Sequence, residues 1–91
     1  MNICFLFGKI NSEIKFDFLL NQDLHISIAS CFILSEDGNE IKLIAFDKMA
    51  DILYSDYELG THIILEGSII NNCIEVMRIY EYWKWNKDYE R

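Results

Sequence analysis

The sequence predicts an all-β protein, a small closed barrel of five strands with one short helix between the third and fourth strands. Residues 46–70 run from the end of a strand, through a short amphipathic segment and a glycine turn, into a second strand of alternating pattern. That second strand contains Gly67, which indicates a bulge or sharp bend, as at a barrel corner. The 91 residues are enough for one domain of this kind and too few for two.

The first quarter of the chain predicts two extended segments. Residues 2–10 form a nearly continuous apolar run, which predicts a first strand with both faces covered. Gly8 is expected to let this strand bend as the sheet closes. Phe16 and Phe18 alternate with charged residues, which fits a short strand or an extended connection, and residues 21–23 predict a turn.

The next segment predicts a hairpin. Residues 24–34 form the second long strand, with Leu24 and two isoleucines on one face and small or polar residues on the other. The dipeptide Asp37-Gly38 is a strong turn signal. Residues 40–46 then form the third strand of the barrel.

A short helix is expected directly after the third strand. Asp47 is a candidate N-cap, because its carboxylate can accept from the free amides of the first turn. Spacing of i, i+3, i+4 gives the helix an apolar stripe made of Met49, Ile52 and Leu53. Gly60 supplies the turn that follows.

The last two strands are predicted from residues 62–70 and 73–80. Alternation places one set of residues in the fourth strand on the core side: Ile63, Leu65, Gly67 and Ile69. Asn71-Asn72 predicts a two-residue type I′ hairpin, since Asn tolerates positive φ. We therefore assign residues 1–80 to the barrel and residues 81–91 to an aromatic-rich C-terminal tail.

A strand, a helix that plugs one end and a kinked strand are the middle of an OB-fold, a five-stranded Greek-key barrel. In its sequence motifs, the chain resembles the bacterial-type single-stranded DNA-binding protein (SSB) family. Its size and Ile-rich composition would suit a small plastid- or cyanobacterial-type member. Asn2, Gly8 and Ile10 match the opening N, apolar run and G-x-L of that family, and residues 26–30 resemble its I-x-L-A-T segment. Its F-G-K-L-A-E and K-G-x-x-V-x-I-E-G-x-L runs are matched by Phe46, Lys48, Met49, Ala50, Asp51, Gly60, Ile63, Leu65, Glu66, Gly67 and Ile69.

Three departures from the SSB pattern argue against high-affinity wrapping of DNA. Two loops that are usually long in the family are reduced here to Asp37-Gly38 and Asn71-Asn72. Ile41 is the residue nearest to a family tryptophan that stacks on bases. A Gly- and Pro-rich tail with an acidic tip is absent from the sequence, which ends at Arg91.

Composition restricts the possible functions. The net charge is −7, from 8 basic and 15 acidic residues, whereas binding to nucleic acid depends mainly on Lys and Arg unless the charges are segregated in space. The acidic residues on or near the helix are expected to form a solvated face that repels DNA from that end of the barrel: Asp47, Asp51, Asp56 and Glu58.

The sequence contains no motif typical of an enzyme, a metal-binding protein or a membrane protein. No Gly-rich phosphate loop, nucleophile elbow or paired-carboxylate signature occurs, and His25 and His62 stand in no catalytic motif, so we expect no enzyme. Three isolated cysteines predict buried thiols rather than a metal site, and no cofactor is expected. The chain has no apolar run of the ~20 residues that span a membrane and no signal-peptide pattern, so we expect it in the cytoplasm, or in the plastid stroma if plastid-encoded.

Binding of an unpaired strand requires aromatic faces for the bases and cations for the phosphates. The tail interleaves both, although Trp83 and Trp85 could instead pack on the barrel or on a partner subunit. Phe46 matches a family aromatic that contacts DNA, and could equally be a core residue. The predicted nucleic-acid-binding residues are Lys9, Lys15, Lys42, Phe46, Lys48, Arg78, Trp83, Lys84 and Trp85.

The sequence is compatible with two functions. The first is binding of single-stranded DNA, or RNA, without sequence preference, in replication, recombination or repair. The alternative is an SSB-like adaptor or subunit that contacts other replication or restart proteins and has little affinity for DNA. A homo-oligomer, dimer or tetramer, is expected in both cases, because so small a barrel with Ile on both strand phases has apolar surface left to bury.

Overall fold

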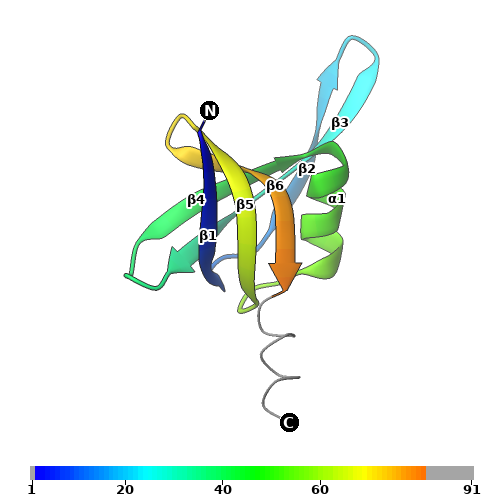
Figure 1. The fold of residues 1–91 in the computed structure, drawn as a ribbon. Coiled ribbons are helices and arrows are strands. Elements are labelled where there is room, and N and C mark those ends of the chain that lie inside the picture. Colours follow the sequence, from blue (N-terminus) through cyan, green and yellow to red (C-terminus); the bar gives the residue numbers. More distant parts are fainter. Residues whose placement is uncertain (1, 82–91) are drawn as a thin grey trace.

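Six strands and one helix make up residues 2–81, the part of the chain that the computed structural model describes (Figure 1). In chain order these elements are β1 (Ile3–Ile10), β2 (Lys15–Asn21), β3 (Leu24–Ser35), β4 (Glu40–Phe46), α1 (Asp47–Asp56), β5 (His62–Ile70) and β6 (Cys73–Glu81).

The strands form one sheet that closes into a barrel. Their order is β1-β5-β6-β4-β3-β2, and the ring closes because β1 also pairs with β3. All neighbours are antiparallel except β4 and β6. Ile10 of β1 lies opposite Ile33, and Lys15 of β2 lies opposite Ser30, so β1 and β2 are two halves of one bent strand along β3. The barrel thus has five strands, and the predicted OB-fold with a helix between its third and fourth strands is confirmed.

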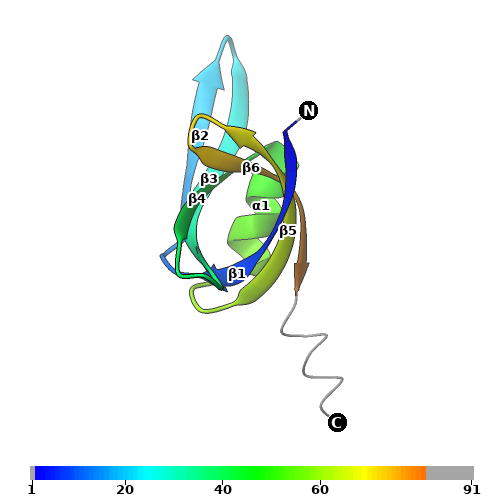
Figure 2. The same cartoon turned by 60° about the vertical axis from the view of Figure 1, so that its left-hand side comes forward.

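The core lies inside this ring and under α1, which closes one end of the barrel (Figure 2). In β3 the inward phase is the one with small residues, from Ser27 and Ala29 to Cys31, while Ile26 and Ile28 are half-buried on the outside. Small side chains are needed inward here because α1 packs against β3. The buried hydrophobic residues are Ile10, Ala29, Cys31, Ile33, Leu43, Ala45, Ala50, Leu53, Ile63, Leu65, Ile74 and Val76.

The bend predicted at Gly67 is present. The pairing of β5 with β6 shifts register between Glu66 and Gly67, and the extra residue is Met77 of β6. Gly67 is buried, and a Cβ there would collide with the Ile74 side chain and lie 2.7 Å from the Glu75 carbonyl oxygen. A side chain at this position would therefore push the two strands apart.

The predicted tight turns are also confirmed. Asn71 and Asn72 have φ of 44° and 68°, as a two-residue type I′ turn requires. Gln22 and Asp23 repeat this geometry, with φ of 48° and 68°. The second pair joins β2 to β3 in a hairpin that projects well beyond the barrel (Figures 1 and 2).

The prediction that Asp47 caps the helix is wrong. Phe46 is the N-cap residue, with no side-chain hydrogen bond to the first turn, and Asp47 has a φ of 59°. The chain turns sharply there, which Asp tolerates better than most residues. The Ser27 hydroxyl instead ties strand to helix: it lies 3.0 Å from the Asp47 carbonyl oxygen and 2.9 Å from Asp51 Oδ1.

Three predicted burial patterns need correction. The inward stripe of α1 is Ala50 and Leu53, with Met49 packed beside them, and Ile52 is not part of this core cluster. Ile69 is 50% exposed, because β5 has by then passed the bulge and left the core. The first strand is not covered on both faces in the single chain, since Phe5 is 69% exposed.

Candidate nucleic-acid interface

The outer surface of β2, β3 and β4 combines aromatic and cationic side chains, and we call it the lysine–phenylalanine face. Strand alternation turns every second residue of these strands outward. Cross-strand pairing then sets the rows: Lys15 lies beside Ser30, Phe32 beside Lys42, and Ile28 beside Phe46. The outward residues that define this face are Lys15, Ile28, Ser30, Phe32, Lys42, Ile44 and Phe46.

Phe32 is the exposed aromatic residue of β3 on this face, and the β1–β2 connection holds its backbone. Its N–H donates to the Ser12 hydroxyl at 2.8 Å, and its carbonyl oxygen accepts from the Asn11 N–H at 2.8 Å. Its neighbours Cys31 and Ile33 are buried in the core, so the ring points outward and is 38% exposed. This is a rigid aromatic platform on the barrel wall.

Two lysines flank this ring. Lys15 and Lys42 come from the strands on either side of β3, and both are exposed. Together with Phe32 and Ser30 they line a hollow of about 290 Å³, which Glu13 also borders. Cations beside an exposed ring are the arrangement that holds a base against an aromatic face and its phosphate against an ammonium group.

The face continues as an apolar surface toward the β2–β3 hairpin. Ile28, Ile44 and Phe46 are all half-buried there, so Phe46 contributes to the surface and to local packing at once. Lys48 is exposed in the first turn of α1, two residues beyond Phe46.

Carboxylates border the lysine–phenylalanine face. Asp17 lies beside Ile28, Glu40 beside Leu34, and Glu75 beside Ile44. The positive charge of the face is therefore confined to its centre.

Two other predicted cations lie on a different wall. Lys9 is on β1, beside Leu34 and His62, and is half-buried. Arg78 is exposed on β6, opposite Glu66 of β5 in the pairing register. The structure thus groups Lys15, Lys42 and Phe46 and separates Lys9 and Arg78 from them. The three tail residues, Trp83, Lys84 and Trp85, lie outside the described residues.

Phe32 is the residue that sequence reasoning missed. A signal was present: in β3, Phe32 shares its phase with Ile26 and Ile28, and this phase is outward because small residues occupy the other. Ile41, the position nearest to the family tryptophan, is half-buried and packs against the core, on the opposite phase of β4 from Lys42. The aromatic ring of the face thus comes from the neighbouring strand.

Reactive and metal-binding groups are sparse in the described part of the chain. Burial raises the pKa of the Cys31 thiol from 9.0 to about 11, so this sulfur stays protonated and unreactive near neutral pH. Within residues 2–81, no three His, Cys, Asp or Glu side chains converge as metal ligands would. In the same residues, no helix is both long and apolar enough to span a membrane.

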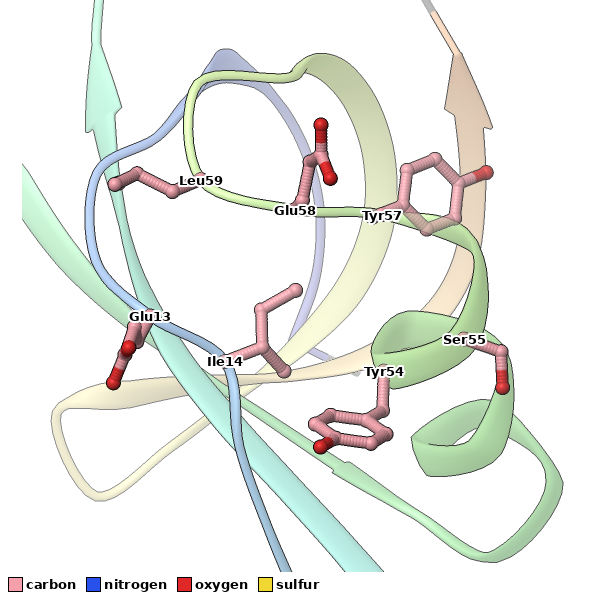
Figure 3. A pocket seen from close by; sticks show the side chains of 7 residues that line it. All are labelled: Glu13, Ile14, Tyr54, Ser55, Tyr57, Glu58 and Leu59. Carbon is pink, nitrogen blue, oxygen red and sulfur yellow. The ribbon is translucent and has the colours of Figure 1, made fainter.

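A second and larger hollow, of about 680 Å³, lies near the end of α1, and we call it the tyrosine hollow. Figure 3 shows that Tyr54 and Ser55 come from the helix, that Glu13 and Ile14 come from the β1–β2 connection, and that the loop before β5 contributes the rest. Its lining residues are Glu13, Ile14, Tyr54, Ser55, Tyr57, Glu58 and Leu59.

Comparison with solved structures shows that this barrel is similar in fold to the barrels of single-stranded DNA-binding proteins. The SSB domain of a Synechococcus sp. protein superposes with a TM-score of 0.76 at 21% identity, covering 88% of this chain and 94% of that one. The wild-type single-stranded DNA-binding protein from Thermus aquaticus gives 0.72 at 15% identity over 89% of this chain and 40% of its own. The small single-stranded DNA-binding protein from Streptomyces coelicolor gives 0.66 at 12% identity, covering 89% and 94%.

No family model and no curated protein sequence matches this chain. At identities this low, the structural likeness establishes the fold. It agrees with the SSB resemblance that the sequence motifs predicted.

Proposed function

We propose that the protein binds single-stranded DNA, without sequence preference and without catalysis, on the lysine–phenylalanine face. The observation that carries this proposal is the exposed Phe32 ring held between Lys15 and Lys42. Stacking of a base on an aromatic side chain contributes about 1–3 kcal/mol and tolerates every base, since each has a π-face. The names of the similar structures, which are single-stranded DNA-binding proteins, support the same function.

The experiment is a titration of a fluorescently labelled poly-dT oligomer at low salt, read by anisotropy. Phe32→Ala should weaken binding roughly tenfold, the loss of about one stacked base. The matched control is Phe18→Ala, because Phe18 is 60% exposed but lies beside Phe16 on the α1 side of the β2–β3 hairpin. The control should bind as the wild type does. Equal affinity in Phe32→Ala and the wild type would remove Phe32 from the site.

Charge is tested by the salt dependence of the same titration. Each phosphate neutralised on a single strand contributes about −0.7 to the slope of log K against log salt. Lys15→Gln/Lys42→Gln should therefore lower the slope by about 1.4 in magnitude. Lys9→Gln/Arg78→Gln removes the same net charge from the other wall and should leave the slope unchanged.

Two outcomes would contradict the proposal. If both double variants lose the same slope, binding follows overall charge and not this face. If the wild type gives no anisotropy change at micromolar protein and low salt, the adaptor function replaces DNA binding.

We further propose that the protein self-associates through the wall formed by β1, β5 and β6. Its outer surface carries exposed apolar side chains from two of these strands: Ile3, Phe5, Met77 and Tyr80. Large apolar side chains exposed on one wall of a small domain indicate an interaction site. It lies away from the lysine–phenylalanine face, so assembly would leave that face open.

A further inference from the structure

The tyrosine hollow has a rim fixed by the backbone. The Ile10 N–H donates to the Thr61 carbonyl oxygen at 2.8 Å, and the Gly60 N–H donates to the Ile10 carbonyl oxygen at 2.8 Å. These bonds tie the loop before β5 to the end of β1. On the helix side, the Tyr54 ring packs on Phe16 with ring centroids 4.8 Å apart. A ligand would meet a surface that is already formed, which lowers the entropic cost of binding.

The lining is acidic and apolar together. Glu13 and Glu58 are exposed carboxylates at the opening, and among the described residues that line the hollow there is no Lys, Arg or His. Leu59 is 58% exposed, and Ile14 and the tyrosines supply further apolar surface (Figure 3). This chemistry suits a group with a flat apolar body and a positive charge beside it, through stacking and charge-assisted hydrogen bonds.

The chain itself carries such a group close by. Glu81, the last residue of β6, pairs with Ile63, which is only four residues beyond Leu59, and β6 contacts α1. In Figure 3 the strand that ends near Tyr57 is β6. The ten residues that follow read Y-W-K-W-N-K-D-Y-E-R and can reach about 33 Å when extended, more than enough to cover the hollow.

Charge complementarity and connectivity select the occupant. The first six of these residues, 82–87, include three aromatic residues and two lysines and no acidic residue, a composition complementary to the two carboxylates of the hollow. Because the segment is attached to the barrel, its effective concentration at the hollow is of millimolar order, so even a weak contact is populated. We propose that residues 82–91 dock in the tyrosine hollow of their own chain.

Intrinsic fluorescence tests this docking directly, because the only two tryptophans of the chain, Trp83 and Trp85, are in the segment. The full-length chain is measured without nucleic acid, by emission maximum and by acrylamide quenching. Glu13→Gln/Glu58→Gln should shift the emission to longer wavelength and raise the quenching constant about twofold, as the indoles lose their contact with the barrel. Leu59→Ser should act in the same direction without changing charge.

The matched control is Asp23→Asn/Glu36→Gln, which removes the same charge at exposed turns outside the hollow. It should behave as the wild type does, and circular dichroism should show all variants folded. Equal quenching in the wild type and both hollow variants would overturn the proposal. Protection that disappears on dilution would overturn it too, because the segment would then be meeting a second copy. The oligomer titration does not read the tryptophans, so the two proposals fail separately.

Discussion

The roles of Phe32 and Gly67 depend on where each residue lies in the barrel wall. Phe32 would be an ordinary core candidate in a run of apolar residues, yet the burial of Cys31 and Ile33 turns its ring outward. Gly67 predicts a bend from the sequence alone, and the structure shows that it lies where β5 meets the bulge of β6 at close range. In both cases the neighbouring strand decides what the side chain, or its absence, contributes.

Gly67→Ala should destabilise the fold. The added methyl group would collide with Ile74 and with the Glu75 carbonyl oxygen, and overpacking of this kind costs about 1–3 kcal/mol. For a domain of this size that corresponds to a fall in Tm of roughly 4–8 °C for each kcal/mol, measured by thermal unfolding. Ser68→Ala, at the next and half-buried position, is the control and should unfold near the wild-type temperature. A Gly67→Ala variant as stable as this control would show that the bulge can widen without cost.

At the scale of elements, the junction of β3 with α1 holds the barrel end closed. The inward residues of β3 are small where the helix lies against them, and Ser27 is the one buried polar residue among those described. Its hydroxyl faces the Asp47 carbonyl oxygen and the Asp51 carboxylate. This contact anchors the start of the helix to β3. It differs from an N-cap, because the hydroxyl donates to an oxygen and does not accept from the first-turn amides.

Ser27→Ala should therefore lower the free energy of unfolding by about 1–2 kcal/mol, since it removes a buried hydroxyl that contacts the Asp47 carbonyl oxygen and the Asp51 carboxylate. Urea denaturation measures the change. Ser55→Ala, on the exposed side of the same helix, should cost nothing. In a double-mutant cycle with Asp51→Ala the two losses should be less than additive, because both changes remove the same contact. Full additivity would mean that the Ser27–Asp51 contact contributes nothing.

On the scale of the whole molecule, the barrel has two unlike walls. The lysine–phenylalanine face is mixed in charge, with cations at its centre and carboxylates at its border. The wall of β1, β5 and β6 exposes large apolar side chains, of which Phe5 is 69% exposed. A net charge of −7 is therefore compatible with the proposed function, because binding depends on where the lysines lie.

Self-association should respond to a single change on the apolar wall. Phe5→Asp places a charge on this surface and should convert the proposed dimer or tetramer to a monomer in sedimentation equilibrium. Phe18→Asp is the matched control, an exposed phenylalanine on the β2–β3 hairpin, and should leave the assembly unchanged. A wild-type protein that sediments as a monomer would contradict assembly through this wall.

Much of the candidate site could be derived from the chain alone. Lys15, Lys42 and Phe46 were predicted as nucleic-acid-binding residues, and the structure brings them to one face. Lys9 and Arg78 were grouped with them only because all are cations on strands. A charged residue in a strand is expected to point outward, but its position in the sequence does not show on which wall of a closed barrel it lies. The sequence alone therefore could not separate Lys9 and Arg78 from the residues of the lysine–phenylalanine face.

What the sequence determined by itself is local in origin. Alternation of period two, the Asn71-Asn72 turn and the break at Gly67 each depend on residues close together in the chain, and they sufficed to predict the strands, the hairpins and the OB-fold. Only the tertiary structure decided which phase of β3 faces inward, how Ser27 holds the helix and that Phe32 is the exposed ring. These depend on packing between segments far apart in sequence, where the space left by α1 and not the hydrophobicity of β3 selects the inner side.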